Sequence, residues 1–272
     1  MKDQTDRAAA FRELHRKGGL ILPNAWDAVS ARLFQEAGCP AVGTTSCGVA
    51  WARGRTDGEG MTRDEMAAEI AVVARGLSIP LSADMEAGYG PTEADVAATA
   101  KAAWDAGAVG INLEDADHAA PGTLFGLEAQ QHRLAAARAA APDLVINART
   151  DVFLLGVGEA GAAREALAIE RGRAWLEAGA DVVFAPGVTD PGTVRRLAEG
   201  IGGPLSLMAG PAAPPPDELF AAGACRISVG PNAMLAAMTR LKQAARVLAE
   251  GRPFADLGPL DASFAELDVL FA

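Results

Sequence analysis

The sequence of 272 residues has few of the residues on which several common chemistries depend. Its three cysteines, Cys39, Cys47 and Cys225, are scattered without a CxxC spacing, and only three histidines are present. The sequence therefore predicts neither a disulfide framework nor a zinc site, and free thiols fit a reducing cytoplasm. Only four lysines occur, and none of them ends an expected strand. Schiff-base aldolase chemistry thus has no candidate nucleophile.

Long apolar runs and an excess of basic residues are lacking as well. No apolar run approaches the length of a membrane span, and the charged N-terminal segment has no apolar signal core. The net charge of -11 argues against nucleic acids and anionic membranes as partners, because both bind basic surfaces. Nucleotides are disfavoured, since neither a GxxxxGKS/T loop nor a strand-anchored GxGxxG is present. We expect a cytoplasmic protein, for which a small anion remains a possible ligand.

Apolar strand-like runs alternate with alanine-rich helical segments along the chain. An Ala-Gly pair precedes four of these runs, at 37–38, 106–107, 178–179 and 222–223, where a preceding helix would end at glycine. Four further runs begin near 20, 80, 144 and 204, which makes eight. Continuous apolar strands alternating with helices indicate a parallel sheet that is covered on its faces. Eight of them predict a closed (β/α)8 barrel.

A single domain is expected over residues 1–272. The barrel would occupy about 20–250, preceded by an N-terminal helix, and the proline-rich run 211–218 would be a stiff loop after the seventh strand. Residues 231–250 carry apolar side chains at helical spacing. The helical tail 251–272 would form a second apolar helix that needs a partner surface, with Phe264, Leu267, Leu270 and Phe271 as its apolar side chains. We predict that these C-terminal helices pack on a neighbouring subunit in a homodimer or homotetramer.

Acidic residues follow two neighbouring apolar strands. Asp84 and Glu86 end one run, and Glu114 and Asp115 end the next. The carboxyl ends of the strands of a (β/α)8 barrel meet at one mouth, so these side chains should converge. Oxygen ligands suit a hard divalent ion, most naturally Mg²⁺ or otherwise Mn²⁺. Such acids can instead cap the helices that follow, but two such ends on consecutive units favour a metal site.

The fifth strand should add a cation to the same mouth. Asn147, Arg149 and Asp151 share one face, because side chains alternate along a strand. Arg149 could be a structural ion-pair partner. Opposite a metal cluster, the better interpretation is a clamp for a substrate carboxylate, because guanidinium binds carboxylate in a two-pronged fork. The residues thus indicate oxygen-ligated metal chemistry on a small anion.

Six segments together resemble the isocitrate lyase/phosphoenolpyruvate mutase superfamily, and the resemblance covers nearly the whole chain. The segments are Pro23-NAWDAVSARLFQEAG, Gly43-TTSCGVA, Thr56-DGEGMTRDE, Ala83-DMEAGYG, Gly110-INLEDADH and Asn147-ARTD. The resemblance implies a Mg²⁺-dependent barrel that binds 2-oxo acids or their enolates. Such enzymes break or make C–C or P–C bonds next to the carbonyl.

The resemblance also implies a metal site. Asp84 aligns with the principal metal ligand of the family. Asp57, Glu86 and Glu114 align with acids that hold the metal mostly through its water molecules. A Mg²⁺ ion chelated by the carbonyl and carboxylate of a 2-oxo acid would stabilise the enolate left after bond cleavage.

Substrate-binding and catalytic roles follow from the same resemblance. Ser46, Cys47 and Gly48 match the segment whose backbone amides and serine hydroxyl hold the substrate carboxylate, and Arg149 matches the substrate-binding arginine. Asp84 would reach the substrate through the metal. The residues expected to be catalytic are Asp57, Glu114 and Arg149.

Two departures from the family pattern limit the reaction. Isocitrate and methylisocitrate lyases carry a loop after the fourth strand whose cysteine acts as the acid or base, but residues 115–133 contain neither cysteine nor lysine. They also lack the asparagine-rich character of the mutase loop. Gly187 stands where those lyases usually present a glutamate after the sixth strand. His118 is the remaining acid/base candidate of the loop, unless it is a surface histidine, and Cys47 is expected to be a small buried residue.

The predicted function is a Mg²⁺-dependent carbon–carbon lyase acting on a small 2-oxo acid or dicarboxylate. It would proceed through a metal-stabilised enolate, by decarboxylation or retro-aldol cleavage. Phosphonopyruvate mutase or hydrolase chemistry is an alternative that uses the same pocket. A third hypothesis is a barrel that binds 2-oxo acids with little turnover.

Overall fold

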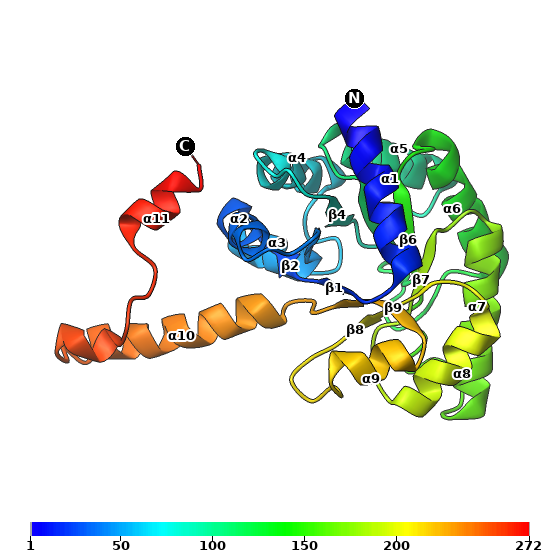
Figure 1. Cartoon of the computed structure of the whole chain (residues 1–272). Coiled ribbons are helices and arrows are strands. Elements are labelled where there is room, and N and C mark those ends of the chain that lie inside the picture. Colours follow the sequence, from blue (N-terminus) through cyan, green and yellow to red (C-terminus); the bar gives the residue numbers. More distant parts are fainter. Residues whose placement is uncertain (1, 272) are drawn as a thin grey trace.

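A parallel sheet closes on itself at the centre of the molecule, as the computed structural model shows (Figure 1). Residues 2–271, which the structure describes, contain nine short strands: β1 (Leu20–Leu22), β2 (Asn24–Ala25), β3 (Val42–Thr44), β4 (Leu81–Asp84), β5 (Gly110–Glu114), β6 (Val145–Arg149), β7 (Val182–Phe184), β8 (Leu205–Met208) and β9 (Ala224–Ser228). All neighbouring pairs are parallel. The predicted (β/α)8 barrel is confirmed.

The first barrel strand is split into β1 and β2 by Pro23, which has no backbone N–H to donate. β1 pairs with β9, and β2 pairs with β3, so the two halves together close the ring. The side chain of Asn24 ties the closure: its Nδ2 donates to the carbonyl of Thr44 at 2.8 Å, and its Oδ1 accepts from the amides of Val229 and Gly230 at 3.0 and 2.9 Å. Nine strands therefore occupy eight positions.

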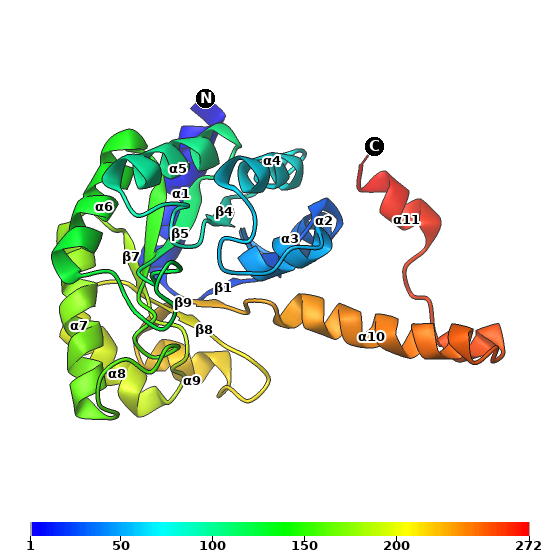
Figure 2. The same ribbon diagram turned by 180° about the vertical axis from the view of Figure 1, so that it is seen from behind.

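Helices surround the sheet on the outside (Figures 1 and 2). Those between β2 and β9 are α2 (Ala28–Glu36), α3 (Ser46–Ala52), α4 (Arg63–Ala74), α5 (Glu93–Asp105), α6 (Leu127–Ala140), α7 (Ala162–Glu177), α8 (Pro191–Ile201) and α9 (Pro216–Ala221). The proline-rich run is thus only partly a loop, because Pro216 begins α9. Proline is tolerated in the first turn of a helix, where its missing N–H has no intrahelical partner.

The Ala-Gly pairs mark helix ends as the sequence predicts. Gly38, Gly107, Gly179 and Gly223 follow α2, α5, α7 and α9 with φ of 87, 99, 101 and 112°. This left-handed backbone suits glycine, which has no Cβ to clash. At the other end, Thr62 begins α4 with a capping box in which its side chain and that of Glu65 satisfy each other's backbone amides.

The helix α1 (Lys2–Lys17) covers the end of the barrel where the strands begin (Figure 1). Phe11 is fully buried in a small cluster with Leu20, Leu22 and Val145. A Cβ built on Gly110 of β5 would lie 2.7 Å from the ring of Phe11. The helix α1 can therefore pack closely against β5 because Gly110 has no side chain. This end of the barrel is filled by packed side chains and is not a pore.

We expect Gly110→Ala to destabilise the fold by about 1–3 kcal/mol, the usual cost of adding a carbon to a packed core. Phe11 is fully buried and the backbone oxygen of Val145 lies 3.2 Å from the new carbon, so neither can yield cheaply. Urea unfolding measures the change. Gly126→Ala is the control, since nothing lies within 4 Å of a Cβ there. Equal free energies of unfolding for the two variants would contradict the close packing of α1.

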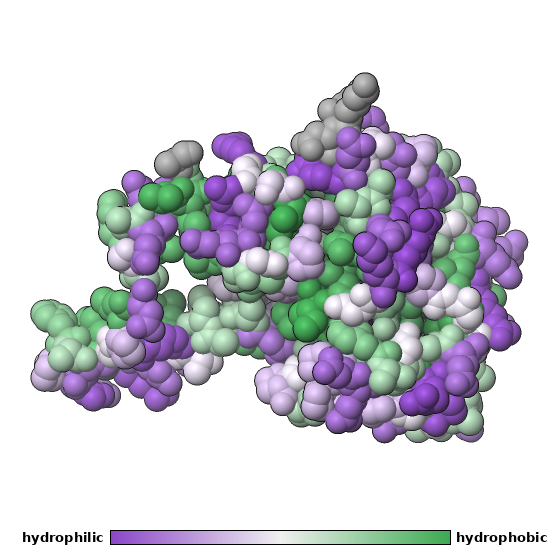
Figure 3. Space-filling view, viewed as in Figure 1, coloured by the Kyte–Doolittle hydropathy of each residue, from purple (hydrophilic) through white to green (hydrophobic). Residues whose placement is uncertain are grey.

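The C-terminal helices project from the barrel (Figures 1 and 2). They are α10 (Asn232–Ala249), the short 3-10 helix η1 (Phe254–Leu257) and α11 (Phe264–Val269), so the expected second apolar helix is two short pieces. Leu241, Leu248 and Phe264 are 58, 56 and 86% exposed, and apolar surface is visible along this arm (Figure 3). Packing on a neighbouring subunit, and the assignment of 1–272 to one domain, stay predictions.

Residues 2–271 include no helix with the length and apolar character needed to span a bilayer.

Candidate active site

Two adjoining cavities open where the barrel strands end. The larger, of about 350 Å³, is lined mostly by charged and polar residues from the ends of β5 and β6 and from the segments that follow β3, β4, β5 and β6. The smaller, of about 180 Å³, extends across the mouth to β7, β8 and β9. Ser46, Asp57 and Arg149 line both cavities, so the two are lobes of one cleft. Every acid predicted as a metal ligand lines at least one of them.

Asp84 ends β4 and lines the smaller cavity, with 7% of its surface exposed. Its Oδ2 accepts a hydrogen bond from the amide of Ser46 at 3.1 Å, and its Oδ1 accepts from Nδ2 of Asn112 at 3.4 Å. The Ser46 hydroxyl in turn donates to Oδ1 of Asp57 at 3.0 Å. Ser46 therefore connects the two carboxylates that face the space between the lobes.

Glu86 lies in the turn after β4 with a left-handed backbone, φ 49°. The hydroxyl of Tyr89 donates to its Oε1 at 3.2 Å, and the amide of Glu59 donates to its Oε2. Burial raises the pKa of Glu86 to about 7, and the nearby charges of Asp84, Asp57 and Glu114 act in the same direction. Glu86 therefore keeps its proton to a higher pH in the folded protein than in the unfolded chain.

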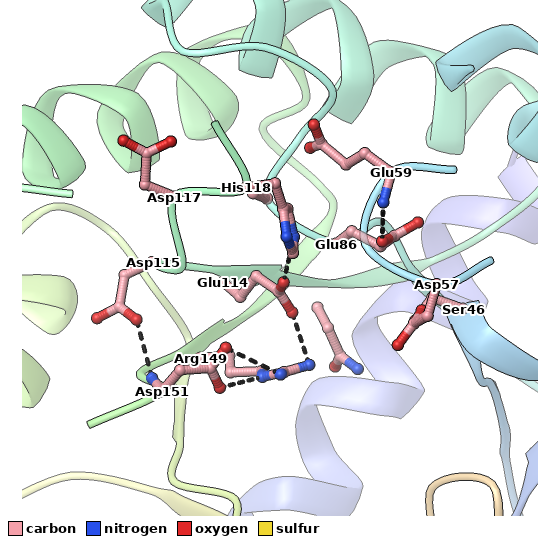
Figure 4. A network of polar contacts seen from close by, with 12 residues as sticks. Ser46, Asp57, Glu59, Glu86, Glu114, Asp115, Asp117, His118, Arg149 and Asp151 are labelled. Carbon is pink, nitrogen blue, oxygen red and sulfur yellow. Dashed lines mark hydrogen bonds and ion pairs between the residues drawn. The ribbon is translucent and has the colours of Figure 1, made fainter. Parts of the chain in front are cut away.

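Glu114 and Arg149 end the neighbouring strands β5 and β6 and form an ion pair, Nη1 to Oε2 at 2.6 Å (Figure 4). Nε and Nη2 of Arg149 donate to the two oxygens of Asp151 at 2.6 and 2.9 Å. Three of the five N–H groups of an arginine are thereby engaged. The fork that we expected to clamp a substrate carboxylate faces Asp151, because the chain turns back directly after β6, and two N–H groups remain.

His118 stands on the loop between β5 and α6 and points at the acids (Figure 4). Its Nε2 hydrogen-bonds Oε1 of Glu114 at 2.8 Å, and this bond raises the pKa of His118 to about 9. The alternative that His118 is a surface histidine away from the site is therefore wrong, since His118 lines the larger cavity. The chemical role of His118 stays a prediction.

Hydrogen bonds fix the two ends of the same loop. Ala116 and Leu124 form an antiparallel bridge, and the amide of Asp117 donates to the carbonyl of Thr123 at 3.0 Å. Fully buried Asp115 accepts from Nε of Arg171 at 2.7 Å and from the amide of Asp151 at 2.8 Å. Asp115 thus anchors the loop and does not face the cleft.

Ser46, Cys47 and Gly48 begin α3, whose first amides lack intrahelical acceptors. The amide of Ser46 already donates to Asp84, which leaves those of Cys47 and Gly48 as the candidates for a substrate carboxylate. A Cβ on Gly48 would lie 2.7 Å from Cγ2 of Thr45, so only glycine fits. Cys47 is buried, and burial raises the pKa of its thiol, as expected for an inert residue.

The donor set fits a hard cation held through few direct bonds. Within residues 2–271, no three histidine, cysteine, aspartate or glutamate side chains lie close enough to enclose an ion by themselves. A carboxylate such as Asp84, completed by water and substrate oxygens, is nevertheless the usual way in which proteins bind Mg²⁺. Burial is the main cause of the raised pKa of Glu86, and the charges of Asp84, Asp57 and Glu114 add to it; a cation among these carboxylates would offset that added repulsion.

Several residues around the acids were not anticipated from the sequence. Fully buried Arg226 of β9 donates from Nη2 to Oδ1 of Asn112 at 3.2 Å, and Asn112 contacts Asp84. Because side chains alternate along strands, Asn112 lies one layer below Glu114, and the spacing of two residues could have predicted it. Glu59 and Tyr89, which hold Glu86, come from long loops that carry no such periodic signal.

Comparison with known proteins places the chain among relatives of similar length and fold. A family model described as phosphoenolpyruvate phosphomutase matches residues 11–249. An uncharacterized protein of Mycobacterium tuberculosis strain H37Rv is 32% identical over 259 residues, 95% of this chain and 94% of the relative. A 2-methylisocitrate lyase of Halalkalibacterium halodurans is 30% identical over 213 residues, 75% of this chain and 68% of that enzyme.

A solved structure agrees with the whole barrel. It is that of a provisionally named lyase/mutase from Burkholderia cenocepacia J2315, with 34% sequence identity and a TM-score of 0.90. The superposition covers 100% of this chain and 98% of the other.

The raised pKa of Glu86 makes the stability of the metal-free protein pH-dependent. The unfolded carboxyl ionises near its ordinary pKa of 4.5, and the folded one near 7. The folded state therefore binds more protons between these values and loses stability as pH rises through them. The free energy of unfolding of Glu86→Gln, relative to that of the original chain, should rise by up to about 3 kcal/mol as pH increases through this window. Above the window the difference should stay constant.

Urea unfolding in EDTA at pH 5 and pH 8 measures this difference. Glu177→Gln removes one exposed carboxyl and corrects for the change in net charge. If Glu86→Gln and the original chain lose stability in parallel between the two pH values, folding does not raise the pKa of Glu86 as described.

Proposed function

The chain belongs to the phosphoenolpyruvate phosphomutase family, and we propose that it is a Mg²⁺-dependent lyase-type enzyme that acts on a small 2-oxo acid. The observation that carries the proposal is the convergence of Asp57, Asp84, Glu86 and Glu114 on one cleft beside Arg149. The reaction would be carbon–carbon cleavage, by decarboxylation or retro-aldol release of a pyruvate-like enolate. A cytoplasmic location is part of the proposal.

Asp84 would hold the metal directly. It lines the smaller lobe, and hydrogen bonds from Ser46 and Asn112 fix its orientation. Asp57, Glu86 and Glu114 would hold the water molecules of the ion. When bound, Mg²⁺ supplies a Lewis acid that stabilises negative charge on the carbonyl oxygen of the substrate.

Cys47 and Gly48, through their backbone amides, and Arg149 would bind the substrate carboxylate, while Ser46 holds Asp84 and Asp57 beside it. The amides at the start of α3 and the two remaining N–H groups of Arg149 are preorganised donors, which need no rearrangement as charge develops. The charge of Arg149 is balanced by Glu114 and Asp151, so its contribution is to orient the substrate more than to attract it.

The supply of cations favours a lyase over phosphonopyruvate chemistry. Among the residues lining the two lobes, Arg149 and His118 are the only side chains that carry positive charge, and each is paired with Glu114. A phosphonate dianion would add charge that these partners do not offset. A barrel that binds 2-oxo acids with little turnover is the second candidate, favoured by the loop that lacks the lyase cysteine.

Removal of Asp84 should abolish the metal dependence of ligand binding. We expect oxalate to bind in Mg²⁺ and to be lost in EDTA, and Asp84→Ala to bind it weakly in either condition. Glu86→Gln should weaken metal affinity by about 10- to 100-fold, as partners of metal-bound water do. Calorimetry measures both, with Asp217→Ala as an exposed control. Oxalate binding that is equal with and without EDTA would refute the metal site.

Turnover should separate the candidate reactions. We expect poor cleavage of 2-methylisocitrate, because positioned proton transfer contributes about 10²–10⁴ in rate and the loop cysteine is absent. Steady-state assays with 2-methylisocitrate, oxaloacetate, a 4-hydroxy-2-oxo acid and phosphonopyruvate, each with Mg²⁺, test this.

The outcomes of these assays are distinct. Turnover of a 2-oxo acid alone supports the lyase. Absence of any turnover, with oxalate binding intact, identifies the binding barrel. Methylisocitrate cleavage at the rate of loop-cysteine lyases would contradict the proposal and assign a catalytic role to His118 or Cys47.

A further inference from the structure

The smaller lobe has two chemically different sides. Asn24, Thr45, Ser46, Asp57, Asp84 and Asn112 line one side with polar groups from β2 to β5. The facing side comes from β7, β8 and the turns after β6 and β9, and four of its side chains are apolar. We name Leu154, Phe184, Met208 and Pro231 the apolar wall.

The apolar wall offers no charge to a ligand. Arg149 is the one cationic side chain among the residues that line this lobe, and it lies on the boundary with the larger lobe. Its fork is already held by Asp151 and its Nη1 by Glu114. A second carboxylate placed against the wall would lose its hydration and gain no ionic partner.

The backbone keeps polar side chains out of the wall near Gly187. This glycine has φ 86°, and a Cβ there would lie 3.1 Å from the amide nitrogen of Leu154 and 3.3 Å from the carbonyl carbon of Phe153. The turn after β6 therefore packs against the bare backbone of Gly187 and supplies Leu154 to the lobe. Leu154 can therefore line the lobe only because residue 187 has no side chain.

We propose that the apolar wall receives the part of the substrate beyond C3, and that this part is a short neutral chain. The inference rests on the proposed function, in which the amides of Cys47 and Gly48 and the metal hold the 2-oxo carboxylate end. That end faces the polar side of the lobe, so the rest of the molecule lies toward Leu154, Phe184 and Met208. About 180 Å³ is small for a ligand pocket, which limits the chain to a few carbons.

The inference also selects between the two proposed routes. A substrate that loses CO₂ brings a second carboxylate into the lobe. In retro-aldol cleavage of a 4-hydroxy-2-oxo acid, the C4 hydroxyl proton would pass to a carboxylate of the polar side, such as Asp57, the C3–C4 bond would break, and its electron pair would remain in the enolate while a neutral carbonyl fragment leaves. The apolar wall suits the neutral fragment, because apolar contact stabilises it and no charge is desolvated.

A pair of ligands of matched length tests the inference. 2-Oxovalerate and 2-oxoglutarate share the 2-oxo acid and differ in a terminal methyl group against a terminal carboxylate. With Mg²⁺ present, 2-oxovalerate should bind more tightly than pyruvate, by about 3- to 4-fold for each added methylene. 2-Oxoglutarate should bind more weakly than 2-oxovalerate by about tenfold or more. Calorimetry gives the three dissociation constants.

One substitution should reverse the preference. Leu154 is 44% exposed, so Leu154→Arg can fold while it places a cation on the apolar wall. We expect it to tighten 2-oxoglutarate by about tenfold relative to 2-oxovalerate. Val72→Arg, at a helix position 41% exposed on α4, is the control for net charge and should leave the ratio unchanged.

The results separate this inference from the proposed function. If 2-oxoglutarate binds as tightly as 2-oxovalerate in a Mg²⁺-dependent manner, or if Leu154→Arg leaves their ratio unchanged, the apolar wall does not select the substrate and the function stands. If none of the three ligands binds in Mg²⁺, the proposed function itself fails.

Discussion

The ion pair between Glu114 and Arg149 links the geometry of the barrel strands to the arrangement of the site residues. These residues are register partners at the ends of β5 and β6, so the hydrogen-bonded ladder of the sheet sets them side by side. The same ladder pairs Asp84 with Asn112 and Asn112 with Asn147. A shift of one residue would turn every one of these side chains toward the helices. The chemistry of the mouth is therefore fixed by strand register, and flexible loops only complete it.

Charge balance explains why the interior beneath the mouth is polar. Arg226 is fully buried, and its Nε and Nη1 have no partner within the described residues. Burial lowers the pKa of Arg226 to about 10, which still leaves it charged at neutral pH, and its positive charge lies below the acids. Since arginine only donates, it fixes Oδ1 of Asn112 toward itself and turns the Asn112 NH₂ group toward Asp84. One buried cation thus orients the carboxylate at the centre of the site.

The sequence predicted the elements that depend on local pattern. Glycine at helix ends, apolar strands and acids at strand ends follow from backbone conformation and from the period of two, and the barrel and the gathering of Asp84 and Glu114 were both anticipated. Pairing across the mouth was not. The pairing of Arg149 with Asp151 agrees with the ion-pair alternative, since the two residues are two positions apart on one face. Nothing local indicates that Glu59 reaches Glu86, or that Phe184 and Met208 face one lobe, because these contacts depend on how separate segments pack over the barrel.

The loop after β5 shows how a change in one segment alters what the whole site can do. Its base is tied by the Ala116–Leu124 bridge and by Asp115, which is buried against Arg171. His118 is in turn bound to Glu114, the same carboxylate that pairs with Arg149. A loop that delivers an acid to a departing group must be free to approach it, whereas this loop is fastened to the metal-binding side of the cleft. The four side chains of the apolar wall therefore include no titratable group. Retro-aldol cleavage there would need no acid on the wall, because the fragment leaves as a neutral carbonyl once its hydroxyl proton has passed to a carboxylate of the opposite side, such as Asp57, and the enolate is stabilised.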